Sequence, residues 1–233
     1  MKKILLLVAL AAFAFSASAQ RAESRMFSFR KADQPVTFGI RAGVNFSGVA
    51  DKSTDSDFNN FFNRTKTGFN VGLNMDVPIL TSFYIQTGLY FTTKGGRYQE
   101  SARELYEVKA TLNPMYLELP VYASWRLDCS KHTQIQVNIG PYFGVAVGGK
   151  AKYSEKSEKL DYSESEKEPL FGKDAILRRG DIGLGVGAGI TVHKIYLGFN
   201  YSFGFNNLVK DVDDSVWYKF RNRNFTIQTG FNF

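Results

Sequence analysis

The chain has 233 residues, of which 15% are aromatic and 21 are glycines, and its formal net charge is +7. This length suits one all-β domain, and the single cysteine, Cys129, excludes an internal disulfide framework. The basic residues are dispersed, without a basic helix or zinc-binding spacing, which argues against nucleic acid as a partner.

The first 19 residues have the pattern of a cleavable signal peptide. Lys2 and Lys3 precede an apolar run that ends at Phe15, and small residues follow up to Ala19. The run is shorter than the roughly 20 residues that a membrane-spanning helix needs. We therefore predict export with cleavage after Ala19, and a polar, poorly ordered periplasmic lead-in over residues 20–35.

Eight segments between residue 36 and residue 233 alternate apolar with small or polar residues. They are Val36–Phe46, Phe69–Val77, Phe83–Thr93, Met115–Arg126, Ile135–Val145, Ile182–Val192, Ile195–Phe205 and Phe225–Phe233. The polar faces carry charged and amide side chains, so they do not form the dry core of a soluble protein, and the apolar faces need lipid as their solvent. Only a closed barrel satisfies every backbone group in lipid. The pattern predicts an all-β fold, an eight-stranded antiparallel transmembrane up-and-down β-barrel over residues 36–233, integral to the outer membrane.

The connections alternate between short and long. The short ones lie near residues 78–82, 128–133 and 193–194, and the long ones span 47–66, 95–113, 148–179 and 206–220. Outer-membrane barrels have short periplasmic turns and long extracellular loops, which predicts that both mature termini are periplasmic. Residues 150–168 mix both charges with almost no apolar content, and we expect a mobile, exposed loop there.

The last strand ends on Phe233. An aromatic residue at this place resembles the signal by which outer-membrane barrels are recognised for insertion, and it implies the barrel-assembly machinery as a partner. We expect Phe225–Phe233 to close the barrel against Val36–Phe46. Outer-membrane lipid and lipopolysaccharide are the other expected partners, and the identity of any periplasmic or surface protein partner stays open.

Four charged residues fall on the inward face of the predicted barrel. Arg41 and Glu118 lie near mid-height, and Asp76 and Arg126 lie toward the periplasmic end. Unpaired charges are costly in a low-dielectric interior, so we predict a structural network of ion pairs in the lumen. The alternative is a polar path for a small solute or proton. The glycines of Ile182–Val192 are expected to make room for inward tyrosines, namely Tyr84, Tyr90, Tyr116, Tyr122, Tyr142 and Tyr196.

Residues for catalysis, cofactors or metals are not evident in the sequence. The glycines from Gly183 to Gly189 lie within a strand and lack the helix of a dinucleotide fingerprint. His132 and His193 lie in predicted periplasmic turns. The acidic stretches 51–57 and 211–215 lack the glycine and glutamate of a calcium-binding EF-hand loop. We therefore predict no catalytic, cofactor-binding or metal-binding residues.

Two strand motifs resemble the PorT-type outer-membrane β-barrel family. They are Tyr116-Leu-Glu118-Leu-Pro120-Val and Asn138-Ile-Gly140-Pro141-Tyr142. The resemblance implies an eight-stranded barrel, like the OmpA and OmpX types, in a Gram-negative outer membrane. A few members of that family are linked to protein secretion.

The sequence favours a non-enzymatic outer-membrane barrel with a structural or surface-interaction role through four extracellular loops. The alternatives are an accessory barrel for protein secretion or small-solute transport, and a lipid-modifying outer-membrane enzyme.

Overall fold

The computed structural model describes residues 30–53, 64–102, 106–157, 162–171, 177–209 and 218–233. They form ten β-strands and no helix in these ranges. The strands are β1 (Thr37–Ser53), β2 (Lys66–Leu80), β3 (Phe83–Thr93), β4 (Arg97–Ala102), β5 (Tyr106–Ser130), β6 (Thr133–Ser157), β7 (Tyr162–Pro169), β8 (Gly180–Val192), β9 (Ile195–Gly204) and β10 (Tyr218–Asn232). Each of the eight predicted strands is present.

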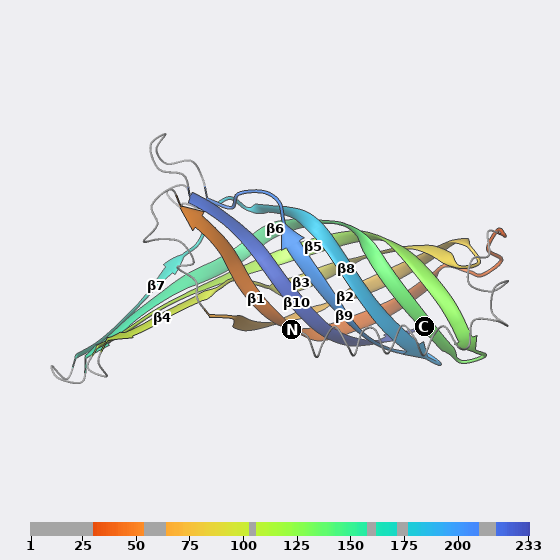
Figure 1. The fold of residues 1–233 in the computed structure, drawn as a ribbon, viewed down its shortest axis with the longest axis horizontal. Helices are drawn as coiled ribbons and strands as arrows, with labels where there is room; N and C mark the ends of the chain where they lie inside the picture. Colours follow the sequence, from red (N-terminus) through yellow and green to blue (C-terminus); the bar gives the residue numbers. More distant parts are fainter. Residues whose placement is uncertain (1–29, 54–63, 103–105, 158–161, 172–176, 210–217) are drawn as a thin grey trace, which may run out of the picture.

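Eight of these strands form a closed antiparallel ring (Figure 1). Around the ring, each strand pairs with the next in the order β1, β2, β3, β5, β6, β8, β9, β10. The ring closes because β10 also pairs with β1, in a register that runs from Gly39 opposite Asn232 to Ser53 opposite Tyr218. The predicted eight-stranded barrel and its predicted closing pair are confirmed.

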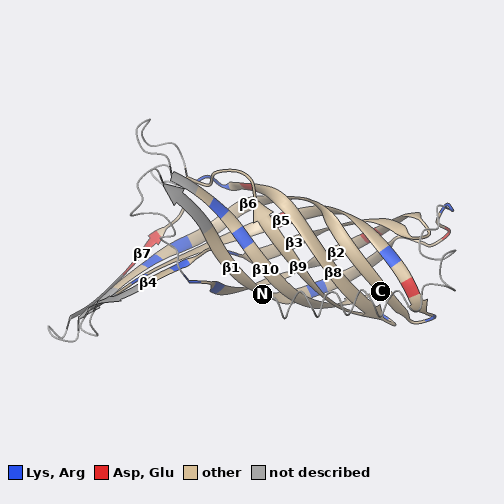
Figure 2. Cartoon of the chain, viewed as in Figure 1, with Lys and Arg blue, Asp and Glu red and all other residues tan. Residues whose placement is uncertain are grey.

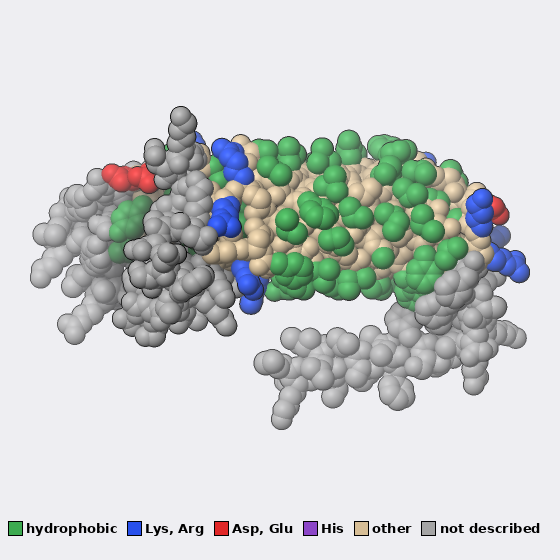
Figure 3. All heavy atoms as spheres, turned by 90° about the horizontal axis from the view of Figure 1, so that it is seen from above, with side chains coloured by type: hydrophobic (Ala, Val, Ile, Leu, Met, Phe, Trp, Pro, Cys, Tyr) green, Lys and Arg blue, Asp and Glu red, His purple; other side chains and the backbone are tan. Residues whose placement is uncertain are grey.

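The outer face of the ring is apolar. Large side chains such as Leu73 and Phe199 are more than half exposed, while the polar residues that alternate with them point into the barrel. Figure 3 shows hydrophobic side chains in a band across the middle of the barrel on the face in view, and Lys and Arg segments lie mainly nearer its two ends in Figure 2. A soluble barrel would place its apolar residues inside. In the part of the chain that the structure describes, no helix is both long and apolar enough to cross a membrane.

The two ends of the barrel differ in their connections. At one end, here called the turn end, tight turns join β2 to β3, β5 to β6 and β8 to β9. The described residue nearest the amino terminus, Arg30, and the carboxy-terminal Phe233 also lie at the turn end, since Arg30 bonds to Thr81 and Phe233 to Phe38. The opposite end, here called the loop end, carries the long connections.

Two long connections contain strands, which corrects the expectation of irregular loops there. β5 and β6 are 25 residues long each and extend past the ring at the loop end, where β4 pairs with β5 and β7 with β6. We call this four-stranded sheet the extension; it projects to the left in Figure 1. The expectation of a loop over residues 150–168 is wrong for its described part, because 150–157 and 162–168 are strand residues, while the expected exposure is found at Lys152 and Glu168. The alternation continues there, with Leu112, Ala151 and Tyr153 on one face and lysines on the other, but too few large apolar residues take part for the sequence pattern to reveal the strands.

The lead-in is also more structured than expected over its last residues. The backbone N–H and the hydroxyl of Thr81 both donate to the carbonyl of Arg30, at 3.0 and 3.2 Å. Lys31 forms a β-bridge with Leu80, and the hydroxyl of Tyr84 donates to the side chain of Gln34. Residues 30–35 therefore pack against the turn end. The predicted signal peptide, residues 1–19, and most of the acidic stretches 51–57 and 211–215 lie outside the described residues.

Candidate functional site

The lumen holds two of the predicted charged residues together near the turn end. Arg126 on β5 lies 2.7 Å from the Asp76 carboxylate on β2, and Gln86 on β3 donates to the same carboxylate at 2.9 Å. The Arg126 guanidinium also stacks on the ring of Tyr84, 4.2 Å from its centre. Asp76 and Arg126 are almost completely buried. Together with Gln86, this pair joins three neighbouring strands on the inner side of the barrel.

Arg41 and Glu118 do not pair with one another in the described part of the chain. The Arg41 guanidinium lies 4.1 Å from the centre of the Tyr196 ring, and its NH1 donates to the backbone of Ile40. Arg41 is 2% exposed. A cation held on an aromatic face is attracted by the ring quadrupole, so Tyr196 takes the place that the sequence assigned to a carboxylate.

Glu118 pairs instead with Lys94, at the loop end of the lumen. The Lys94 ammonium lies 2.5 Å from Glu118 and 3.1 Å from Asp181, and it is 4.2 Å from the centre of the Tyr142 ring. Asp181 also accepts hydrogen bonds from Tyr142 at 3.2 Å and from Asn222 at 2.9 Å. Lys94 and Asp181 are 1% and 0% exposed. We call Lys94, Glu118, Asp181, Tyr142 and Asn222 the lysine cluster.

The sequence-based choice of lumenal residues missed Lys94 and Asp181. Each lies one residue beyond a predicted strand segment, Phe83–Thr93 and Ile182–Val192. Each also continues the inward set of its strand, because Lys94 follows Tyr90 and Thr92, and Asp181 precedes Gly183 and Gly185 at spacings of two. Extending the alternation by one step would have found both residues.

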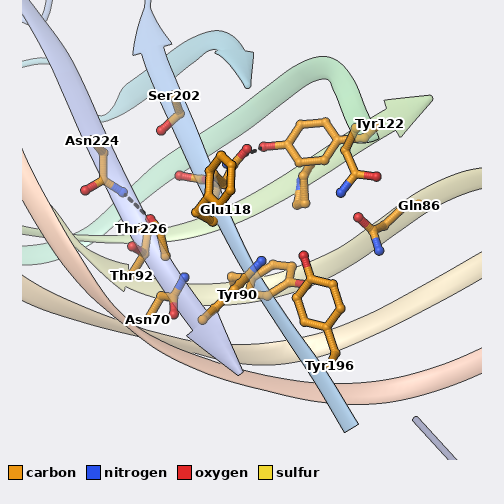
Figure 4. Close-up of a pocket in the computed structure, with 15 residues that line it drawn as sticks. Asn70, Gln86, Tyr90, Thr92, Glu118, Tyr122, Tyr196, Ser202, Asn224 and Thr226 are labelled. Atoms are coloured by element: carbon orange, nitrogen blue, oxygen red, sulfur yellow. Dashed lines mark hydrogen bonds between the residues drawn. The ribbon is translucent and has the colours of Figure 1, made fainter. Parts of the chain in front are cut away.

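Tyrosines and glycines fill the rest of the lumen, as the sequence predicts. A Cβ placed on Gly185 would lie 2.3 Å from the Tyr122 hydroxyl, and one on Gly189 would lie 2.5 Å from the Tyr196 ring. The polar side chains in Figure 4 point toward one another around a remaining cavity of about 40 Å³. This volume has room for only a few water molecules. The lumen is therefore a packed, polar interior.

The turn end carries three residues that the sequence singled out. His132 and His193, in neighbouring turns, stack with ring centres 4.5 Å apart. Phe233 is 65% exposed and packs edge-on against Phe231. Within the described ranges, no group of three or more His, Cys, Asp or Glu residues could hold a metal ion.

The loop end has a cleft of about 670 Å³ between the extension and the start of β2. Its lining is entirely polar or charged: Lys66, Arg97, Lys109, Thr111, Asn113, Lys150, Lys152 and Ser154. The Lys66 amine donates to the carbonyl of Lys94 at 3.2 Å, so the cleft begins directly above the lysine cluster. Figure 2 shows the blue segments of the extension gathered where its strands leave the ring.

Solved structures of small outer-membrane proteins are similar to this chain. Outer membrane protein OprG from Pseudomonas aeruginosa has 10% sequence identity and a TM-score of 0.43, with 88% of this chain and 97% of OprG covered. Ail of Yersinia pestis, solved in complex with the heparin analogue sucrose octasulfate, has 15% identity and a TM-score of 0.38, with 86% and 100% covered. Neisserial surface protein A has 13% identity and a TM-score of 0.36, with 86% and 100% covered. No curated protein matches the chain significantly.

The family is identified by a sequence model. The model described as the outer membrane protein beta-barrel domain matches residues 18–210, which is most of the chain. Its description agrees with the closed ring, the outward apolar band and the polar interior. The chain therefore belongs to the outer membrane protein beta-barrel domain family and is an integral outer-membrane β-barrel protein.

Proposed function

We propose that this protein is a non-conducting, non-catalytic barrel that interacts with material at the cell surface through the extension. The observation that carries the proposal is the length of β5 and β6. A strand crosses a bilayer with about 9 to 11 residues. β5 and β6 have 25 each, so more than half of each strand is available outside the membrane.

This proposal sets the loop end outside the cell and the turn end, with both mature termini, in the periplasm. Short periplasmic turns and long outer loops are the rule for bacterial barrels. Cys129, the only cysteine, is exposed near the turn end. In intact cells, a membrane-impermeant maleimide should not label the natural protein, whose Cys129 lies near the turn end. It should label the C129S/K152C variant, whose cysteine lies in the extension. The reverse labelling pattern would contradict the orientation.

The packed lumen supports the absence of conduction. Tyrosines, the Asp76–Arg126 pair and the lysine cluster occupy the interior, and an eight-stranded barrel has little room beyond its side chains. In planar bilayers the purified protein should give no steady conductance. A reproducible open-pore current would favour the alternative role in small-solute transport.

The test of the surface role removes the extension from an intact ring. The N–H of Leu112 donates to the carbonyl of Gly96, and that of Leu170 to Gly149, so each pair of chain ends already lies in contact. Excising residues 97–111 and 150–169 should leave heat-modifiable barrel folding unchanged. Cells carrying this variant should behave like deletion cells in adhesion and aggregation. A purely structural role would be favoured if cells carrying the excision variant keep normal adhesion and normal antibiotic resistance, while full deletion abolishes the resistance.

Membership of the PorT-type family, and with it a role in secretion, is the second candidate. It depends on the motifs around Tyr116 and Tyr142. Both tyrosines flank Lys94, and the motif residue Glu118 binds it, so the motif residues have a structural task in the lysine cluster. Normal surface export of cargo proteins after deletion would reject the secretion role.

The non-catalytic part of the proposal has its own test against a lipid-modifying enzyme. His132 and His193 lie at the turn end, away from the outer leaflet in the proposed orientation, and a general base must lie within reach of its substrate. Lipid A mass spectra should be identical with and without the gene for this protein.

The aromatic residue at the end of β10 is proposed as the address for barrel assembly. Phe233 is the most exposed of the large apolar residues described. An F233A variant should reach the outer membrane in reduced amounts while a purified sample refolds normally in detergent. Equal amounts in the membrane would remove this role.

A further inference from the structure

The extension separates its charges between its two faces. In paired antiparallel strands, residues directly opposite one another lie on the same face. The pairs Arg64 with Arg97, Arg97 with Thr111, and Thr111 with Lys152 therefore form one row across four neighbouring segments. Three of the four residues in this row are basic.

A second and a third row carry the same sign of charge. Asn113 lies opposite Lys150, and Lys109 lies opposite Ser154, both on the face that holds Arg97. We call this the basic face; its charged members with described side chains are Arg64, Arg97, Lys109, Lys150 and Lys152. The cleft above Lys66 is lined by this face. None of the described side chains on it is acidic.

The charged side chains described on the opposite face have the other sign, and apolar residues such as Ala110 and Leu112 lie beside them. Glu166 lies opposite Tyr153, and Glu168 lies opposite Ala151. Tyr153 and Ala151 alternate along β6 with Lys150 and Lys152. The segment that looks like a neutral mixture of charges in the sequence is thus sorted by the strand period of two into a basic and an acidic side.

Folding alone gives no reason for this separation. Like charges placed directly opposite in a sheet are destabilising, and Arg64 and Arg97 are such a pair. Opposite charges in the same places would stabilise the sheet. The Arg64–Arg97 pair works against stability, and the two neighbouring rows add further cations without a described acid on the same face. Such a concentration of one sign of charge indicates a ligand of opposite charge.

We infer that the basic face binds an extended acidic polysaccharide at the cell surface, through sulfate, phosphate or carboxylate groups on the saccharide chain. This inference rests on the proposed surface role and names its partner class. The four segments that share the first row are spaced at about 4.8 Å, which places cationic groups across a width of about 15 Å. That width suits successive charged groups of an extended chain.

The lining of the cleft selects this partner among polyanions. Thr111, Asn113 and Ser154 offer hydroxyl and amide groups between the cations, which match the hydroxyls of a sugar. The lining is rich in charge, whereas the centre of a protein–protein interface is depleted of charge, which argues against a protein partner. It contains no aromatic residue, whereas proteins that bind single-stranded nucleic acid stack its bases on aromatic side chains, which argues against nucleic acid.

Distance from the bilayer argues against lipid headgroups as the anion. Val147, 47% exposed, is the last large apolar residue on the outer side of β6 before the extension. Lys152 lies five residues further on, or about 17 Å along the strand. This exceeds the reach of a lysine side chain to a phosphate at the membrane surface.

The test measures binding of dextran sulfate, with neutral dextran as the control, to the full-length protein in nanodiscs of zwitterionic lipid. The natural protein should bind only the sulfated polymer, and more weakly as salt rises, because exposed charges are screened. Substituting Lys150 and Lys152 by Gln should weaken binding about tenfold or more. Unchanged binding by this K150Q/K152Q variant would overturn the inference.

A charge-matched variant separates the basic face from overall charge. E166Q/E168Q raises the net charge by two on the acidic face, and combining it with K150Q/K152Q restores the natural net charge. The variant with all four substitutions should bind dextran sulfate as weakly as K150Q/K152Q. Binding restored to the natural level would show a response to net charge alone and would overturn the inference.

Two competitors test the partner class. Single-stranded DNA that displaces dextran sulfate at equal charge concentration would favour nucleic acid. Displacement of dextran sulfate by protein-free nanodiscs that contain phosphorylated lipid would favour a lipid headgroup. Either result would overturn the inference. These binding measurements do not depend on cell adhesion. A protein that needs its extension for adhesion but binds no sulfated polymer would keep the surface role and lose the polysaccharide.

Discussion

The lumen and the extension use charged residues in opposite ways. In the lumen, Lys94 is buried between two carboxylates, and Asp76 is buried against Arg126. In the extension, exposed cations lie beside other cations, as Arg64 lies beside Arg97. A buried charge must be paired to be tolerated, while an exposed one is free to meet a ligand. The difference distinguishes the lumen, which holds the barrel together, from the extension, which we propose interacts with material at the cell surface.

The strongest test of this comparison is a K94M variant. It leaves Glu118 and Asp181 without their cation in the interior, and removing one partner of a buried ion pair costs about 3 to 5 kcal/mol. We expect a loss of this order in the free energy of unfolding, measured by guanidinium titration in detergent.

The control for K94M neutralises the acids as well. The triple variant K94M/E118Q/D181N removes the unpaired charges and should recover part of the lost stability. A K94M protein as stable as the natural one would mean that the lysine cluster does not hold the lumen together.

A substitution inside the ring should have a smaller effect. In G185L, the new side chain meets the Tyr122 hydroxyl, and overpacking of this kind costs about 1 to 3 kcal/mol. We expect a lower guanidinium midpoint and less of the heat-modifiable folded form. A Y122L change in the same chain should restore part of both, whereas normal folding of G185L alone would remove the packing role of this glycine.

The smallest effect is expected in the extension. In R97Q, one member of the like-charged Arg64–Arg97 pair is neutralised, and such cross-strand pairs contribute about 0.2 to 1 kcal/mol. The stability of the barrel should stay the same or rise slightly, while binding of dextran sulfate falls. A loss of stability similar to that of K94M would make the basic face part of the folding framework.

The ring was predictable because its chemical contrast is strong. Apolar residues that face lipid alternate with polar ones at a period of two, so strands such as β3 were located to the residue. The lysine cluster was only half predictable, because Lys94 and Asp181 lie just beyond the apolar segments. The partner of Arg41 was not predictable from charge, since an aromatic ring serves in place of a carboxylate.

The extension escaped prediction for a physical reason. Its apolar alternation is weak, because Val108, Ala110 and Leu112 alternate with polar residues on β5 while β6 and β7 carry mostly charged and small residues. Each of these two strands repeats one sign of charge at a spacing of two, Lys150 and Lys152 on β6 and Glu166 and Glu168 on β7. A search for like charges at a spacing of two residues would have indicated β6 and β7.

The pairing of β1 with β10 has a consequence for how the molecule forms. Nearly the whole length of the barrel domain separates these strands in the chain, so their contact has a high sequence separation and a slow approach. Until β1 and β10 pair, each presents an unpaired strand edge, which is a template for aggregation. The unclosed protein therefore needs protection of these two edges on its way to the membrane.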